Sequence, residues 1–273
     1  MSTAAQPITT RNARFQQWQS LLSNRNKRQR SRQFVVQGVR PITLALEHGW
    51  PVEALLFDGD RPLSGWAREI LGAVQAERFA LSGALMAELA EKDAAELIAV
   101  VALPADDLDR ITVRPDFLAV VFDRPTSPGN LGSIIRSADA FGADGVIVTG
   151  HAADPYDPAA VRASTGSLFA VPTVRVPSPA EVLDWVAGQR SAGVPVQVLG
   201  TDEHGDAAVS ATDLTGPTLL LVGNETTGLS AGWRAAVDRM VSIPMTGSAS
   251  SLNAANAATV VLYESARQRR VGG

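Results

Sequence analysis

Cysteine is absent from this sequence, and histidine occurs only three times in 273 residues. Without cysteine the chain can form no disulfide and no thiolate intermediate, which excludes base methylation by a cysteine nucleophile. His48, His151 and His204 lack the spacing of metal ligands. We therefore expect chemistry that uses neither a thiol nor a metal.

Long hydrophobic runs are also absent. The longest aliphatic segments, LIAVVAL and FLAVVF, have the length of strands and are far too short to span a membrane. The first ten residues, MSTAAQPITT, contain no apolar core of the signal-peptide type. We expect no membrane segment, a cytoplasmic location and a disordered N-terminus over residues 1–10.

Acidic residues are missing from the first 40 positions, although the whole chain has a net charge of −4. A predicted helix over residues 11–24 is followed there by a predicted basic loop. That loop holds five cations within eight residues, namely Arg25, Lys27, Arg28, Arg30 and Arg32. A solvated basic surface is one interpretation, and contact with the charged groups of a polyanion is the one we favour.

Apolar periodicity divides the chain into two α/β units. Residues 11–103 alternate short strands with helices, the last of which is predicted from Ser82 to Glu91. Residues 104–116 contain two prolines among charged residues and are the expected linker. Residues 117–273 contain five expected strands separated by helices, which predicts a doubly wound parallel sheet; the strands are FLAVVF, GVIVTG, VPVQVLG, PTLLLVG and MVSIP.

Three of these strands lead into loops of small and polar residues, GTDEHGD, GNETTGLS and PMTGSASS. Ligands of a doubly wound sheet bind beyond the carboxyl ends of its strands, so these loops are the site candidates. Glu225 would place a carboxylate at the rim, although a simple turn explains its loop equally well. The chain has neither a dinucleotide glycine fingerprint nor a Walker A loop, which disfavours an NAD-dependent oxidoreductase.

The last loop is expected to end at Ser251, which would cap a helix that starts at Leu252. Asn253 and Asn256 fall in the first turns of this alanine-rich helix, where asparagine is a poor helix former. Such residues are usually retained because they form hydrogen bonds. This indicates a polar site at the start of the helix.

A second helix is predicted after a Pro/Gly loop, and it carries Asn130 and Arg136 among apolar and small residues. An arginine in this setting is usually one half of an ion pair or a phosphate ligand. A structural arginine that bonds a neighbouring strand end remains the alternative.

Three segments together resemble the signature motifs of the SpoU (TrmH-like) family of RNA ribose 2′-O-methyltransferases; they are NLGSIIRSADAFGA, LLLVGNETTGLS and IPMTGSASSLNAANAATVVLYE. The resemblance covers residues 117–270. The first hundred residues are more loosely similar to the family's ribosomal-protein-like RNA-binding domain, with Gln37-Gly38 where the family often has Glu-Gly.

The resemblance implies a SPOUT fold, an α/β parallel sheet with a C-terminal deep trefoil knot, preceded by a small α/β RNA-binding domain. It also implies a homodimer and S-adenosylmethionine as cofactor. By motif position, the implied catalytic residues are Asn130, Arg136, Glu225, Ser251 and Asn253. The implied cofactor-binding residues are Thr201, Gly223, Ile243 and Leu252.

The implied activity is methyl transfer to a ribose 2′-hydroxyl of structured RNA, with ribosomal RNA favoured. Transfer to tRNA is an alternative, as is a non-catalytic RNA-binding or ribosome-assembly role on the same fold. Because the hydroxyl must lose its proton, positioning and charge stabilisation should dominate, and Arg136 suits that task.

Overall fold

The computed structural model describes residues 5–90 and 95–271. The chain divides in space into two compact units, Met1–Pro104 with Tyr156–Phe169, and Ala105–Pro155 with Ala170–Gly273. The predicted domains over residues 11–103 and 117–273, with a linker over 104–116, describe folding units and stay predictions. In space, Tyr156–Phe169 groups with the first unit although it lies within the expected C-terminal domain.

The first unit is built on a five-stranded mixed sheet of order β1-β4-β3-β5-β2. Its strands are β1 (Gln6–Ile8), β2 (Gln33–Gln37), β3 (Val52–Asp58), β4 (Glu77–Leu81) and β5 (Leu97–Ala102). The strand β5 runs antiparallel to both β2 and β3, whereas β4 is parallel to β3 and β1.

Helices surround this sheet and bury its apolar faces. They are α1 (Ala13–Ser23), α2 (Arg25–Ser31), α3 (Val39–Glu47), α4 (Gly65–Ala73), α5 (Gly83–Leu89), α7 (Pro158–Ser164) and α8 (Ser167–Ala170). Phe15, Trp18 and Leu21 recur on one face of α1 and are buried in the core with Phe79 of β4. The predicted amphipathic helix is therefore confirmed.

The N-terminal prediction is wrong for residues 6–8, which form β1 and not a disordered tail. The strand pairs in parallel with β4, and Ile8 is buried in the core of the unit. Sheet pairing and one buried side chain order a segment whose own sequence carries little signal. Residues 1–4 lie outside the described part of the chain, as does Glu91 at the end of the helix predicted from Ser82.

The basic stretch predicted as a loop is the helix α2. Asn24 ends α1 and also caps α2, because its side chain accepts a hydrogen bond from the N–H of Lys27 at 3.1 Å. Arg, Lys and Gln are good helix formers, and this cap starts a helix where we expected loop. Arg32 ends α2 in the left-handed conformation, with φ of 57°.

The second unit is built on a seven-stranded sheet of order β10-β12-β9-β11-β6-β7-β8 in which every pair is parallel. Its strands are β6 (Leu118–Asp123), β7 (Gly145–Thr149), β8 (Thr173–Val176), β9 (Gln197–Thr201), β10 (Ala207–Ala208), β11 (Thr218–Val222) and β12 (Arg239–Ser242). The predicted doubly wound parallel sheet is confirmed. The five-strand expectation missed the two edge strands, β8 and β10, which are short.

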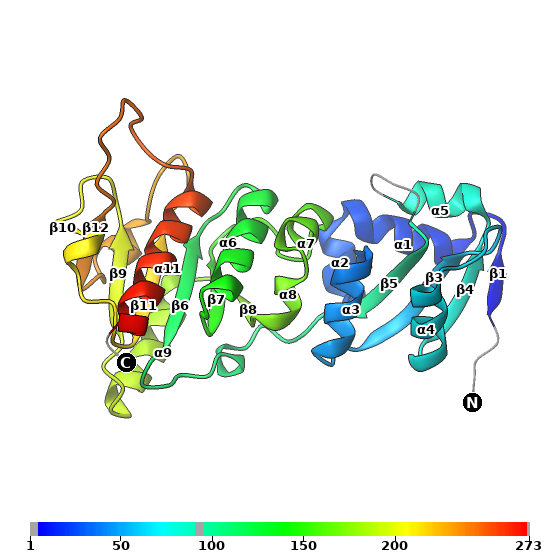
Figure 1. Ribbon diagram of the computed structural model, residues 1–273, viewed down its shortest axis with the longest axis horizontal. Coiled ribbons are helices and arrows are strands. Elements are labelled where there is room, and N and C mark those ends of the chain that lie inside the picture. Colours follow the sequence, from blue (N-terminus) through cyan, green and yellow to red (C-terminus); the bar gives the residue numbers. More distant parts are fainter. Residues whose placement is uncertain (1–4, 91–94, 272–273) are drawn as a thin grey trace. The chain divides into compact units, whose positions relative to one another are not determined.

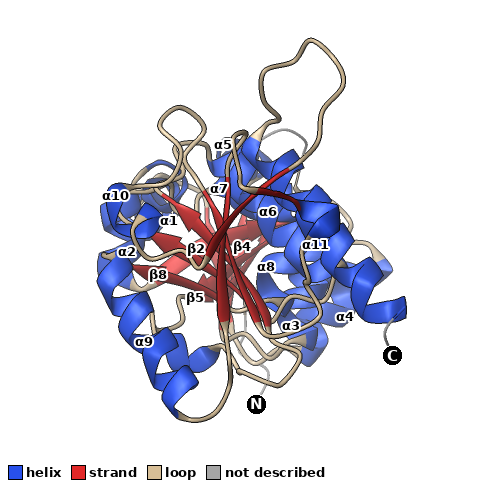
Figure 2. Ribbon diagram, turned by 90° about the vertical axis from the view of Figure 1, so that its left-hand side faces the viewer, coloured by secondary structure: helices blue, strands red, loops and turns tan. Residues whose placement is uncertain are grey.

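Helices cover both faces of this sheet, with α9 and α10 on one side and α6 and α11 on the other (Figure 2). The α-helices of this unit are α6 (Pro128–Ala140), α9 (Pro179–Ser191), α10 (Ala231–Arg234) and α11 (Ala254–Val271), with short 3-10 turns at Leu108–Arg110 and Val209–Ala211. The helices α6 and α11 lie beside each other (Figure 1), and the hydroxyls of Ser137 and Thr259 are 2.7 Å apart between them. Their first turns are therefore brought to the same end of the sheet.

None of the described helices is both long and apolar enough to cross a membrane. Within the described residues, His, Asp and Glu also form no group of three or more that could hold a metal ion.

Candidate active site

A cleft of about 880 Å³ lies at the carboxyl ends of β9, β11 and β12. The loops after these strands form its walls, together with the segment that leads into α11. Seven residues that the sequence analysis singled out line it: Thr201, Gly223, Glu225, Ile243, Ser251, Leu252 and Asn253. The structure therefore brings all four predicted cofactor positions into one cavity, and their roles there stay predictions.

A chain of side-chain hydrogen bonds joins the three motif segments at this cleft. Asn130, in the first turn of α6, donates from Nδ2 to Oε1 of Glu225 at 2.8 Å. Asn253 donates from Nδ2 to Oδ1 of Asn130 at 3.1 Å. Thr126 donates to the second oxygen of Glu225 at 3.2 Å. One carboxylate and two amides thus fix each other's orientation, which is how a site is preorganised for charge development.

Asn253 also begins α11, which corrects the predicted cap at Ser251. Its Oδ1 accepts from the N–H of Ala255 at 2.9 Å and of Asn256 at 3.3 Å, and the helix starts at Ala254. Ser251 is exposed two residues earlier, in the loop that lines the cleft. The asparagine side chain caps the helix through Oδ1 and bonds Asn130 through Nδ2, so one residue serves both the helix start and the site.

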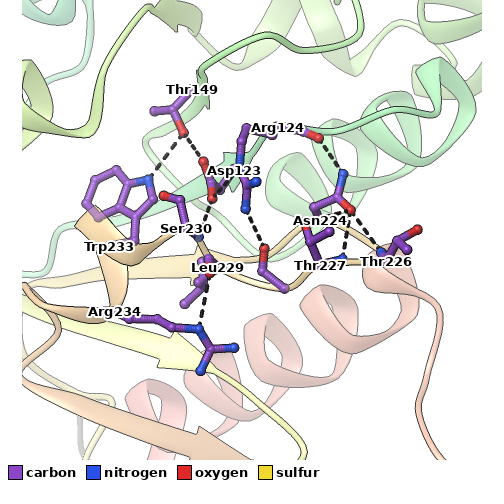
Figure 3. Close-up of polar contacts among 11 residues, drawn as sticks. Asp123, Arg124, Thr149, Asn224, Thr226, Thr227, Leu229, Ser230, Trp233 and Arg234 are labelled. Atoms are coloured by element: carbon purple, nitrogen blue, oxygen red, sulfur yellow. Dashed lines mark hydrogen bonds and ion pairs between the residues drawn. The ribbon is translucent and has the colours of Figure 1, made fainter.

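A buried carboxylate at the end of the neighbouring strand β6 anchors the loop after β11 (Figure 3). Asp123, at the end of β6, is 1% exposed and accepts hydrogen bonds from the hydroxyl of Thr149 at 3.0 Å and the N–H of Ser230 at 2.8 Å. Arg124 pairs with the same carboxylate at 3.1 Å and donates to the carbonyl oxygen of Gly228 at 2.9 Å. The loop over residues 224–230 is therefore anchored to the centre of the sheet at two points.

Asn224 fixes the near end of the same loop. Its Nδ2 donates to the carbonyl oxygen of Arg124 at 2.7 Å, and its Oδ1 accepts from the N–H groups of Thr226 and Thr227 at 2.9 and 3.1 Å (Figure 3). Gly223 permits this close fold, since a Cβ there would lie 2.5 Å from the carbonyl carbon of Gly228. A glycine is required at position 223 for steric reasons.

Acidic side chains follow β9 on the opposite wall of the cleft. Asp202 accepts hydrogen bonds from the N–H of His204 at 3.1 Å and from Arg234 at 2.9 Å. The backbone hydrogen bond from His204, followed by the contact with Arg234, lowers the pKa of the Asp202 carboxyl below its ordinary value. Glu203 and Asp206 line this wall beside the Asp202–Arg234 pair, so its carboxylates outnumber its guanidinium, which suits a cationic ligand group.

Arg136 lies apart from this arrangement. It is exposed on α6, it is not among the residues that line the cleft, and it makes no hydrogen bond or ion pair with the described residues. Six residues of α-helix separate it from Asn130, which places the two on different faces of the helix. The alternative of a structural arginine bonded to a strand end is therefore not what the structure contains.

The four basic residues of α2 and Arg32, which follows the helix, differ in their surroundings. Arg28 is 2% exposed, donates to the carbonyl oxygen of Leu21 at 2.7 Å and pairs with Asp157 at 3.4 Å. This corrects its prediction as an RNA ligand, because its guanidinium is enclosed in the fold. Lys27, Arg30 and Arg32 are exposed, and Arg25 is half-buried.

The sequence analysis did not single out Asp123, Arg124, Asn224, Asp202 or Arg234. An Asp-Arg pair directly after the buried run FLAVVF was the available signal, since an acid at the end of a buried strand needs a partner. Asp123, Arg124 and Asn224 find partners about 100 residues away in the chain, and Asp202 and Arg234 are 32 residues apart, so local patterns cannot identify these pairs.

The chain was compared with known families and structures. Residues 117–263 match the SpoU rRNA Methylase family and residues 12–99 match the SpoU L30e-like domain. A 23S rRNA (uridine(2479)-2′-O)-methyltransferase from Streptomyces viridochromogenes is 66% identical over 98% of this chain and 94% of its own length.

Solved structures give the same result. The crystal structure of the SpoU methyltransferase AviRb from Streptomyces viridochromogenes, in complex with AdoMet, superposes with a TM-score of 0.93 at 66% identity, over 96% of this chain and 100% of that one. An AdoMet-bound rRNA methyltransferase from Sinorhizobium meliloti superposes with a TM-score of 0.84 at 28% identity, over 96% of this chain and 98% of that one.

Proposed function

Because the chain belongs to the SpoU rRNA methylase family, we propose that it transfers a methyl group from S-adenosylmethionine to the 2′-hydroxyl of a uridine in 23S rRNA. The observation that carries this proposal is the bonded set of Asn130, Glu225 and Asn253, of which Glu225 and Asn253 line the cleft. These residues come from all three motif segments. The 66% identity to a 23S rRNA methyltransferase over nearly the whole chain supports the substrate.

The cleft fits the cofactor in size and chemistry. Its volume of about 880 Å³ lies within the range of small-molecule sites. The walls offer backbone groups at Gly223 and Leu252, apolar surface at Ile243, and a carboxylate at Asp202 that suits a cationic group. When bound, S-adenosylmethionine supplies a methyl group activated on a sulfonium. We assign its binding to Thr201, Gly223, Ile243 and Leu252.

The remaining motif residues act on the RNA. Arg136 stabilises the ribose oxygen as its proton leaves and holds the adjacent phosphate. Asn130 and Asn253 orient the ribose, Ser251 extends the polar rim, and Glu225 holds both asparagine-bearing segments through its bonds to Asn130 and Thr126. The exposed cations of α2 then contact phosphates elsewhere on the RNA.

We further propose that the C-terminal strands and α11 form the deep trefoil knot of the SPOUT fold, and that the protein acts in the cytoplasm as a homodimer. Exposed apolar side chains on α11, Val260 and Tyr263, support pairing through α6 and α11. Pairing through this face would also give the unpartnered Arg136 of one copy a site to act on in the other.

Methyl transfer from labelled S-adenosylmethionine to rRNA tests the proposal. The substrate should be 23S rRNA, free and in ribosomal particles, from a strain that lacks the corresponding modification. We expect one labelled nucleotide, resistant to alkaline cleavage as a 2′-O-methyl ribose is. Labelling of tRNA alone would establish the tRNA alternative. Binding of 23S rRNA and cofactor without any transfer would establish a non-catalytic role.

A further inference from the structure

The first unit contains a cavity of about 530 Å³ that the proposed chemistry does not use. Its lining comes from the end of β2, the start of α3, the start of β5, one side of α7 and Trp66 of α4. All of these elements belong to the first unit.

Most of the cavity wall is apolar. Val35, Val39, Trp66, Leu97 and Val161 line it. Val39, the first residue of α3, is 58% exposed and is one of six large apolar side chains exposed among the described residues. An exposed aliphatic side chain beside a cavity with an aromatic wall is typical of a ligand site.

The aromatic wall is fixed in place. The indole N–H of Trp66 donates to the hydroxyl of Thr43 on α3 at 3.1 Å, so the ring is tied to the helix that forms the neighbouring wall. A ring held in this way offers a flat apolar surface at low entropic cost to a planar ligand.

Cations stand at the rim of the cavity. Arg40 is exposed and donates from Nε to the carbonyl oxygen of Thr165 at 3.2 Å. Its two terminal nitrogens have no partner among the described residues. Arg162 also lines the cavity, and Glu96 is the single carboxylate among the lining residues. A ligand with a flat apolar part and a negative charge suits both the wall and the rim.

The structure assigns this cavity to one unpaired nucleotide of the RNA substrate, its base against Trp66 and Val39 and its phosphate against Arg40; the assignment rests on the proposed rRNA substrate. Unpaired bases stacked on aromatic side chains are the usual targets of sequence-specific RNA recognition. The same unit carries the basic helix α2 and no acidic residue in its first 40 positions, so its charge favours a nucleic acid over a neutral ligand.

Two variants test the cavity and one controls for charge. Val39→Glu places a negative charge at the mouth, and Trp66→Leu removes the aromatic surface. Gln75→Glu adds the same charge at an exposed position of the same unit outside the cavity. Binding of a full-length 23S rRNA transcript is measured by filter retention, and the contact is located by ultraviolet cross-linking and peptide mass spectrometry.

We expect Val39→Glu and Trp66→Leu each to weaken RNA binding by about 10-fold, as loss of one base stack does. Gln75→Glu should stay within about twofold, a single exposed charge being screened by salt. Affinity for S-adenosylhomocysteine should not change, and the cross-link should fall on a peptide that lines the cavity. Because Val39 is exposed, its variant should melt like the wild type, and it decides the question if Trp66→Leu is unstable.

RNA affinity of Val39→Glu equal to that of Gln75→Glu would overturn the assignment, as would cross-links confined to α2. Binding is the readout, so the test is separate from that of the proposed activity. A wild-type protein that binds RNA through the cavity but transfers no methyl group refutes the activity alone. Methyl transfer with full RNA affinity in both cavity variants refutes the cavity alone.

Discussion

Asn253 donates a hydrogen bond to Asn130 at 3.1 Å although 123 residues separate them in the chain. Each residue belongs to the first turn or the cap of its helix, and Ser137 and Thr259 hold those two helices together one to two turns further along. Glu225 then joins the pair through Asn130. The site therefore depends on the relative position of α6 and α11. Mutations can distinguish the roles of its individual residues.

Asn253 has two roles that different substitutions distinguish. Asn253→Asp keeps an oxygen for the N–H groups of Ala255 and Asn256 but removes the donor to Asn130. We expect normal stability and a loss of methyl transfer on the order of 10²-fold. Asn253→Ala should in addition lower the free energy of unfolding by about 1 kcal/mol through loss of the cap. Single-turnover rates and urea unfolding measure the two effects, and a full rate in Asn253→Asp would leave only the capping role.

Arg136→Ala should abolish methyl transfer without disturbing the fold. The side chain is exposed and has no described partner, so the melting temperature and cofactor affinity should stay close to those of the wild type. Loss of one charge-stabilising group lowers the rate on the order of 10²-fold or more. Arg270→Ala, an exposed arginine on the neighbouring α11, is the matched control. Turnover of Arg136→Ala equal to that of this control would remove Arg136 from the reaction.

Gly223→Ala should weaken cofactor binding. A Cβ at this position would lie 2.5 Å from the carbonyl carbon of Gly228 and 2.6 Å from the nitrogen of Leu229, so the loop must move. Forced shifts of this kind cost about 1–3 kcal/mol, which corresponds to at least a several-fold weaker Kd for S-adenosylhomocysteine in calorimetry. Gly216→Ala, at the other end of β11, introduces a Cβ with nothing within 4 Å and should bind normally. Equal affinities for the two variants would contradict the steric argument.

The basic helix α2 should contribute to RNA affinity through its exposed cations alone. Replacing Lys27, Arg30 and Arg32 by Gln should weaken binding similarly across RNA sequences and reduce the salt slope by about 0.7 to 0.9 per lost contact. Arg28→Gln should instead destabilise the first unit by about 3 kcal/mol, since it removes a buried guanidinium that bonds the Leu21 carbonyl oxygen and pairs with the half-buried Asp157. Filter binding over a salt series and urea unfolding separate the two classes. If the salt dependence of RNA affinity is unchanged after the triple replacement, these cations form a solvated surface that does not contact the RNA.

Acid should remove the contribution that Glu264 of α11 makes to the free energy of unfolding. Hydrogen bonds from Arg267 and then Gln268 lower the pKa of its carboxyl to about 2. Because the folded pKa lies below the ordinary value, this contribution is complete above about pH 4.5 and is lost as the pH falls toward the folded value. The urea midpoint of the wild type should fall more between about pH 5.5 and about pH 3.5 than that of Glu264→Gln. Parallel pH dependences in the two proteins would contradict this assignment.

Local sequence patterns predicted most of the framework. The apolar run FLAVVF supplies β6, buried along its whole length, and Pro158 and Pro179 occupy the first positions of α7 and α9. Both results depend on near neighbours, because burial on two faces and the fixed φ of proline are properties of short segments. The loops after β9, β11 and β12 were located for the same reason.

The sequence by itself therefore determined the five central strands of the parallel sheet, most of the helices, and the edge of that sheet at which the cleft lies. Tertiary structure alone decided that Arg28 is buried against Asp157, that residues 6–8 complete a sheet, that Asn253 and not Ser251 caps α11, and that Asp123 anchors the loop at Ser230. In three of these cases the stabilising contact is made with a partner distant in the chain. In the case of the cap, two neighbouring residues were both able to begin the helix, and the contact of Asn253 with Asn130 lies outside the local sequence. A local pattern shows that a polar group needs a partner, and only the folded chain determines which partner it finds.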